Sequence, residues 1–74
     1  MYETKAKEHR VQLGEAIKVR RKEQRLSQNR LAEMVNSGQS DIYRIEAGKV
    51  SVGIDKLVRI AEALDVPVNK LIPF

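Results

Sequence analysis

The sequence contains no cysteine and only one histidine among its 74 residues. Without cysteine there is no disulfide and no thiolate-ligated zinc, so helical packing or a second subunit must stabilise so small a fold. His9 has no partner ligands in the sequence, and we expect no metal site. A cysteine nucleophile, a phosphate-binding glycine loop and a ligand cluster are also missing. We therefore expect a protein that is not an enzyme and has neither a cofactor nor a small-molecule site.

Long apolar runs are absent as well. No segment approaches the roughly 20 apolar residues of a membrane-spanning helix. Residues 1–10 are polar and charged, unlike a secretory signal. We expect a soluble, cytoplasmic protein without a membrane partner. The length indicates one domain over residues 1–74, with its core at residues 10–72 and a partly frayed N-terminal extension at residues 1–7.

The chain does carry an uneven excess of positive charge. Fourteen lysines and arginines against ten acidic residues give a net charge of +4. The surplus lies in residues 1–26, which hold eight basic and four acidic residues. A basic excess of this kind attracts polyanions, nucleic acid first among them. The alternative is a solvated helix face that only keeps the protein in solution.

Apolar residues recur with helical spacing along almost the whole chain. Helices are predicted at roughly residues 8–24, 28–34, 39–47, 54–64 and 68–72. The first should begin between Lys5 and Val11. Ser27 is the expected N-cap of the second helix, Asn36 can adopt the left-handed conformation that ends it, and Pro67 breaks the fourth. The predicted fold class is all-α, a compact bundle of five short helices.

Two short helices joined by a turn that contains Gly38 make residues 28–47 a candidate helix-turn-helix. Ala32 supplies the small side chain that steeply crossing helices need. Ile42 and Ile45 lie three residues apart and can anchor the second helix on the core. The opposite face of that helix is then free to point outward.

The second helix of the motif begins with polar side chains that can read DNA. Such a helix can lower its N-terminal end into the major groove, where glutamine matches the edge of adenine and arginine that of guanine. The candidates for base contacts, which share one exposed side, are Gln39, Ser40, Tyr43 and Arg44. As alternatives, the first two are plain solvated surface, Tyr43 packs flat on the protein, and Arg44 pairs with an acidic residue of its own helix, Asp41 or Glu46.

Many further positions complete a pattern at fixed spacing. They are Leu13-Gly14-Glu15, Ile17, Arg21, Leu26-Ser27-Gln28, Leu31-Ala32-Glu33, Ser40-Asp41-Ile42, Arg44-Ile45-Glu46, Gly48-Lys49, Leu57, Ile60-Ala61, Ala63-Leu64-Asp65-Val66 and Leu71. This pattern resembles the phage lambda-repressor/Cro-type helix-turn-helix, also called the xenobiotic-response-element family of regulators. The resemblance covers about Leu13–Ile72, nearly the whole chain.

The resemblance implies a five-helix DNA-binding domain of a transcriptional regulator. It also implies a dimer that acts on a two-fold symmetric operator. Our leading interpretation is a repressor that binds a palindromic operator in double-stranded DNA as a homodimer. Family members use the residue matching Gln28 for a phosphate contact, and three of the four candidates above, all but Tyr43, for base contacts. They also often pair the residues matching Arg21 and Glu46, which implies a partly buried, structural ion pair that locks the first helix to the end of the third.

The sequence departs from the family pattern in four places. Asn36 replaces the usual glycine of the turn, Val52-Gly53 replaces a common Pro-Ser, and Arg20 occupies a position that is often apolar. Ser37 and Gly38 stand where an apolar plug and a Ser/Thr cap are usual. This last departure predicts a less rigid turn.

Four more basic residues are candidates for contacts with DNA phosphates. Lys18, Lys22 and Arg25 fall at i, i+4 and i+7, as one stripe of the first helix. Lys49 follows the recognition helix directly. The alternative for the stripe is a solubilising face paired with acidic neighbours on the same helix.

The apolar end of the sequence is the expected homodimer interface, formed by Leu71, Ile72 and Phe74. So small a core benefits from the added burial that a second copy provides. The alternative is that Phe74 folds back on its own core.

The leading hypothesis is a sequence-specific, double-stranded DNA-binding regulator without catalytic chemistry. The alternative is an antitoxin or adaptor module that uses the same fold to bind a protein. We expect no disordered toxin-binding extension after Phe74, which argues against the alternative.

Overall fold

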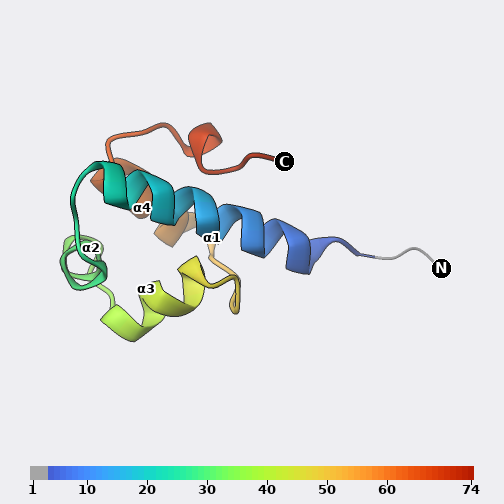
Figure 1. The fold of residues 1–74 in the computed structure, drawn as a ribbon, viewed down its shortest axis with the longest axis horizontal. Coiled ribbons are helices and arrows are strands. Elements are labelled where there is room, and N and C mark those ends of the chain that lie inside the picture. Colours follow the sequence, from blue (N-terminus) through green and yellow to red (C-terminus); the bar gives the residue numbers. More distant parts are fainter. Residues whose placement is uncertain (1–3) are drawn as a thin grey trace.

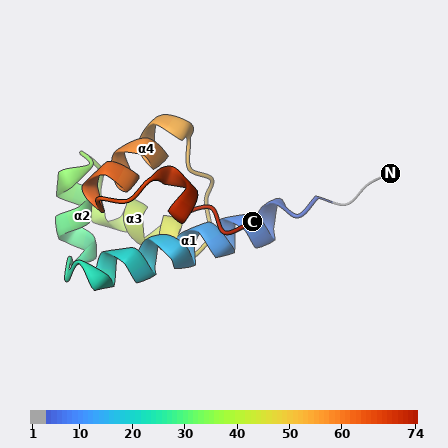
Figure 2. The ribbon, with the colours of Figure 1, turned by 90° about the horizontal axis from the view of Figure 1, so that it is seen from above.

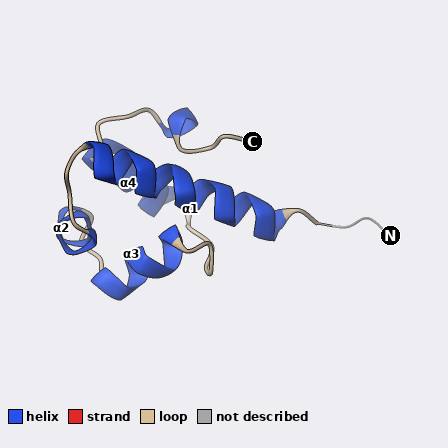
Figure 3. Cartoon of the chain, in the orientation of Figure 1, coloured by secondary structure: helices blue, strands red, loops and turns tan. Residues whose placement is uncertain are grey.

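The structure, a computed structural model that describes residues 4–74, consists of helices joined by short loops. Its elements are α1 (Ala6–Glu23), α2 (Gln28–Met34), α3 (Gln39–Glu46), α4 (Ile54–Ala63) and a 3₁₀ turn (Val68–Lys70) (Figure 1). No strand occurs in this part of the chain (Figure 3). The all-α prediction is confirmed. The first helix begins at Ala6, within the predicted range from Lys5 to Val11. Of the N-terminal extension predicted at residues 1–7, Ala6 and Lys7 belong to α1, and Met1–Glu3 lie outside the described residues.

The fifth predicted helix is only the 3₁₀ turn Val68–Lys70, shorter than the expected residues 68–72. Two prolines explain the difference. Pro67 has extended backbone and starts the turn. Pro73 disfavours helical geometry at the preceding residue, Ile72. The space between them suits a tight 3₁₀ turn better than an α-helix.

All four α-helices end with the same backbone arrangement. The second residue after each helix adopts a positive φ. The backbone N–H of the residue that follows it donates to the carbonyl five residues earlier, as in a Schellman motif. The left-handed residues are Arg25, Asn36, Gly48 and Asp65. Asn36 adopts the conformation expected for it, with a φ of 55°. At the start of α2, Ser27 Oγ accepts from the Arg30 N–H at 2.9 Å, which confirms the predicted N-cap.

Every α-helix contributes side chains to one apolar core. The buried members are Ile17, Leu31, Ala32, Val35, Ile42, Ile45, Leu57, Ile60, Ala61, Leu64 and Leu71. Leu13, Ala16 and Leu26 are partly buried at its edge. Because each helix places one apolar stripe in this core, the opposite faces of α1, α3 and α4 remain exposed to solvent.

Helix α1 lies across α3, with Gly14 at the closest approach. A Cβ on Gly14 would come within 2.7 Å of the Glu46 carbonyl oxygen and closer still to that of Ile45. Figure 1 shows α3 beneath α1, while Figure 2 shows α4 and the C-terminal segment covering another side of it. The first turns of α1 extend beyond the other helices in both views. No helix among residues 4–74 is both long and apolar enough to cross a membrane.

Candidate nucleic-acid interface

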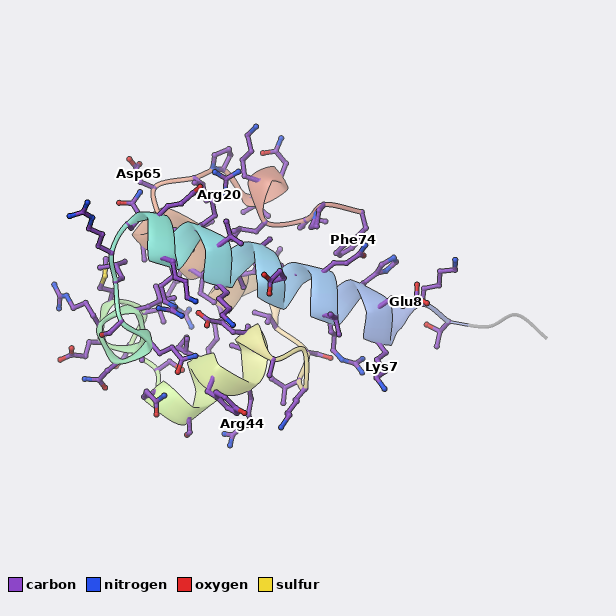
Figure 4. The ribbon with its side chains drawn as sticks, viewed as in Figure 1. Lys7, Glu8, Arg20, Arg44, Asp65 and Phe74 are labelled. Atoms are coloured by element: carbon purple, nitrogen blue, oxygen red, sulfur yellow. The ribbon has the colours of Figure 1, made fainter. Side chains whose placement is uncertain are left out.

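The outer face of α3 carries the four side chains proposed to read bases. Gln39, Ser40, Tyr43 and Arg44 are all exposed, whereas Ile42 and Ile45 on the opposite face are buried. Figure 4 shows Arg44 pointing away from α1. The structure therefore brings these four residues together on one face, as their spacing predicted.

A chain of hydrogen bonds connects this face to the interior. Gln39 Nε2 donates to Gln28 Oε1 at 2.8 Å, and Gln28 Nε2 donates to Glu46 Oε1 at 3.0 Å. Gln28 and Gln39 are the first residues of α2 and α3. The bond between them holds the two helix starts together and limits the conformations of the Gln39 side chain. The sequence indicated roles for both glutamines but not the bond between them.

The buried end of the chain is the ion pair between Arg21 and Glu46, both less than 10% exposed. Arg21 Nε donates to Glu46 Oε2 at 2.6 Å, and Arg21 Nη2 donates to Glu46 Oε1 at 3.0 Å. Arg21 Nη1 also donates to the Leu26 carbonyl at 2.7 Å. The pair implied by the family resemblance is thus present and two-pronged. It joins α1, the loop after α1, and the end of α3.

The turn between α2 and α3 is braced by a second polar cluster that sequence analysis missed. Ser37 Oγ donates to Asp41 Oδ2 at 2.7 Å, and Lys56 Nζ donates to the same oxygen at 2.5 Å. Lys56 Nζ also donates to Ser37 Oγ at 3.2 Å. This cluster ties the turn and the start of α3 to α4, and so supplies a brace where the Ser37-Gly38 departure predicts a less rigid turn.

The same cluster changes the acidity of Asp41. The hydrogen bond from Lys56 is the main reason that the pKa of Asp41 lies below its ordinary value of 3.8, and Ser37 and the positive charge of Lys56 add to the effect. Arg44 contributes least, with its Nη2 3.9 Å from Asp41 Oδ1. Glu46, the other predicted partner of Arg44, does not pair with it, because the Glu46 carboxylate faces Arg21.

The remaining aromatic and basic candidates lie around the C-terminal half of α3. Lys49 Nζ lies 5.6 Å from the centre of the Tyr43 ring, within the range of a cation–π contact. Tyr43 is about half exposed. Lys18 helps to line a small hollow of about 80 Å³, together with Gln28, Tyr43, Glu46 and Ala47. It therefore lies next to the proposed interface.

The predicted basic stripe on the first helix is partly wrong. Lys18 and Lys22 belong to α1, but the helix ends at Glu23 and Arg25 has a φ of 58°. Arg25 is therefore the left-handed residue that terminates the helix, and it does not continue the stripe by one further turn. The spacing alone could not show this, because nothing in the sequence near Arg25 resembles the glycine that usually occupies such a position.

The predicted dimer interface at the C-terminal segment also needs correction. Leu71 is completely buried in the core of its own chain, so it is not available to a second copy. Ile72 is partly buried. The Phe74 ring stacks on His9 at 4.0 Å between ring centres, and Figure 4 shows it against α1. The alternative in which Phe74 folds back on its own chain describes the structure better, although the ring remains about half exposed.

Comparison with known proteins agrees with this geometry. The restriction-modification controller protein C.AhdI from Aeromonas hydrophila has a TM-score of 0.87 and 25% identity, over 92% of this chain and 99% of its own. The DNA-binding domain of BldD has a TM-score of 0.80 and 28% identity, over 89% and 96%. The clp gene regulator ClgR from Corynebacterium glutamicum, at 24% identity and a TM-score of 0.82 over 84% and 66%, shows the fold alone.

No curated protein matches the sequence. The family model described as helix-turn-helix matches residues 17–71, which is more than half of the chain. The chain therefore belongs to the helix-turn-helix family and, with its lambda-repressor/Cro-like fold, is a DNA-binding transcriptional regulator.

Proposed function

We propose that the protein is a repressor that recognises a palindromic operator as a homodimer, and that it acts by binding DNA in the cytoplasm without catalysing a reaction. The observation that supports this most is the hydrogen-bond chain from Arg21 through Glu46 and Gln28 to Gln39. It holds an exposed amide at the start of α3, where a recognition helix enters the major groove.

Gln39 retains the atoms that adenine recognition needs. An amide has two N–H donors and one carbonyl acceptor, and Gln28 engages only one of the donors. The second N–H can donate to adenine N7 while Oε1 accepts from N6. On the same face, Arg44 can address guanine, and Ser40 and Tyr43 can contact neighbouring bases or the backbone.

Phosphate contacts in the proposal come from residues that flank α3. Gln28 lies at one end, and Lys18 and Lys49 lie near Tyr43. Lys22 is one turn along α1 from Lys18, and Arg25 follows the end of that helix. These contacts would make the affinity fall as salt rises, because each neutralised phosphate releases counterions.

The homodimer in this proposal needs apolar surface other than Leu71. Exposed apolar side chains on α4 are Ile54, at 67%, and Val58, at 38%. They lie four residues apart and therefore share one face of the helix. They offer burial that a core of this size can use.

Replacing Gln39 with alanine tests the base-reading role. We expect a loss of roughly 1–3 kcal/mol for the preferred base at one operator position, with other positions unchanged. Gln12→Ala is the matched control, because Gln12 is exposed on α1 beside Lys70 and Pro73. Binding to duplexes with every base at each position distinguishes the outcomes. If Gln39→Ala weakens all sequences equally, Gln39 does not read a base.

A further inference from the structure

Asp41 places a negative charge on the helix that faces DNA in the proposed function. It is the third residue of α3, between the candidates Ser40 and Tyr43. A free carboxylate there would repel phosphates and would attract the nearest cation on its own helix. In the structure the charge is not free, because Lys56 of α4 donates directly to Asp41 Oδ2 at 2.5 Å and Ser37 donates to the same atom.

Two cations thus compete for one carboxylate. Lys56 bonds to Oδ2, while Arg44 Nη2 lies 3.9 Å from Oδ1, close enough for a weak ion pair but beyond hydrogen-bond distance. The Arg44 side chain is 50% exposed and that of Lys56 28%. Lys56, which makes the closer bond, therefore lies deeper between α3 and α4. Arg44, the candidate for reading guanine, makes the longer and weaker contact.

We propose that Lys56 is a positioning residue for DNA recognition: by holding Asp41, it keeps Arg44 free to read its base and removes a repulsive charge from the interface. The inference rests on the proposed function, since it assumes that Arg44 contacts DNA. It extends that function to a residue outside the helix-turn-helix. Through Lys56, α4 takes part in setting the sequence preference.

The acidity of Asp41 agrees with this division of roles. Its pKa is lowered chiefly by the hydrogen bond from Lys56 and least by Arg44. Asp41 therefore stays ionised at neutral pH and continues to attract nearby cations. If Lys56 is removed, Arg44 is the nearest remaining cation of the cluster and can reach the carboxylate by a small change of rotamer.

Two other roles for Lys56 make different predictions. A direct phosphate contact would be lost with the lysine, whatever stands at position 41. A purely structural brace would act through the Ser37 turn, so that Ser37→Ala would reproduce the effect of removing Lys56. If Lys56 acts by holding Asp41, a second substitution at Asp41 should restore the DNA recognition that is lost when Lys56 is removed. Neither of the other two roles predicts this rescue.

The test uses the full chain with Lys56→Met, Asp41→Asn, the double variant, and Lys56→Arg and Ser37→Ala as controls. Affinity is measured for the preferred duplex and for its variants at the base pair that Arg44→Ala identifies. We expect Lys56→Met to bind the preferred duplex about tenfold more weakly and to lose discrimination at that base pair. We expect the double variant to recover both within about threefold, and Lys56→Arg and Ser37→Ala to keep the wild-type preference.

A double variant that stays as weak as Lys56→Met, with a salt dependence lower by about one phosphate contact, would overturn the inference in favour of direct contact. An equal loss on all duplexes, reproduced by Ser37→Ala, would overturn it in favour of a brace.

Should Lys56→Met fail to fold, judged by its circular dichroism, Asp41→Asn alone decides. We expect it to bind at least as tightly as the wild type, and a tenfold loss contradicts the inference. If the wild type itself selects no sequence, the proposed function fails; if it does and rescue is absent, only the inference fails.

Discussion

Removing Arg21 alone should destabilise the protein more than removing the whole ion pair that it forms with Glu46. In Arg21→Met, the Glu46 carboxyl group loses its ion-pair partner at a site that is only 7% exposed, and its sole remaining donor among those observed is Gln28. The Leu26 carbonyl also loses its bond to Arg21. In the double variant Arg21→Met/Glu46→Leu, no buried charge is left behind.

The size of the effect follows from these contacts. Breaking a buried ion pair by removing one partner costs about 3–5 kcal/mol, whereas replacing both partners with apolar residues is often neutral or stabilising. A chain of this length has a free energy of unfolding of about 4–11 kcal/mol, so the single variant loses a large share of it. At roughly 4–8 °C per kcal/mol, its melting temperature should fall by at least about 12 °C. The double variant should stay within about 2 kcal/mol of the wild type, the Leu26 bond being its main loss.

Urea unfolding followed by circular dichroism measures both variants against the wild type, with Glu46→Leu completing the cycle. The same samples test recognition. Gln28 loses its acceptor in the double variant, so we expect the preference at the Gln39 base pair to weaken although stability is retained. If Arg21→Met is as stable as the wild type, or if the double variant is as unstable as the single one, the explanation by a stranded charge is wrong.

Three further predictions follow from local geometry. Gly14→Ala should lower the free energy of unfolding by about 1–3 kcal/mol, because the added Cβ meets backbone carbonyls of α3. Gly53→Ser should have little effect, because a Cβ there meets nothing within 4 Å. Thermal melts compare the two variants. Ser27→Ala should cost about 1 kcal/mol through the lost cap at the start of α2, and an unchanged urea midpoint would contradict this. Asp41→Asn should destabilise the fold at neutral pH. Because the pKa of Asp41 is lowered in the folded protein, its ionised carboxylate stabilises the fold at pH values above 3.8, its ordinary pKa. This stabilisation is lost as the pH falls through the lowered pKa. The difference in melting temperature from the wild type should therefore vanish in strong acid, and a constant difference would refute it.

The main helices were predictable because their signals are local. Ser27 supplies a side-chain cap, Asn36 tolerates a positive φ, and the apolar stripe of α4 repeats every three or four residues. The end of α1 was harder to place, because Arg25 has no intrinsic preference for the left-handed conformation. It adopts it where the loop is held by the bond between Arg21 and the Leu26 carbonyl, which is a tertiary contact.

The candidate site was predictable where a single helix face defines it. The exposed side of α3 follows from the spacing of Ile42 and Ile45. The contacts between elements did not follow from spacing. Lys56 meets Asp41 across 15 residues, and nothing in either segment marks them as partners.

The error at the C-terminal segment has a similar origin. Leu71 is apolar and near the end of the sequence, which suggested a surface for a second copy. Its burial depends on how the 3₁₀ turn folds back over α1 and α4, and local sequence does not encode that path. A short apolar segment is equally compatible with a core and with an interface until the fold is known.

We expect α3 to read a specific sequence on both halves of a symmetric operator. Incubating the protein with a pool of randomised DNA duplexes at near-physiological salt, and sequencing those retained, tests it most directly. We predict enrichment of an inverted repeat with half-site centres roughly 10 base pairs apart, or a small multiple of that spacing. Retention without any motif, which disappears as salt rises, would show only non-specific attraction to the basic surface and would contradict the account.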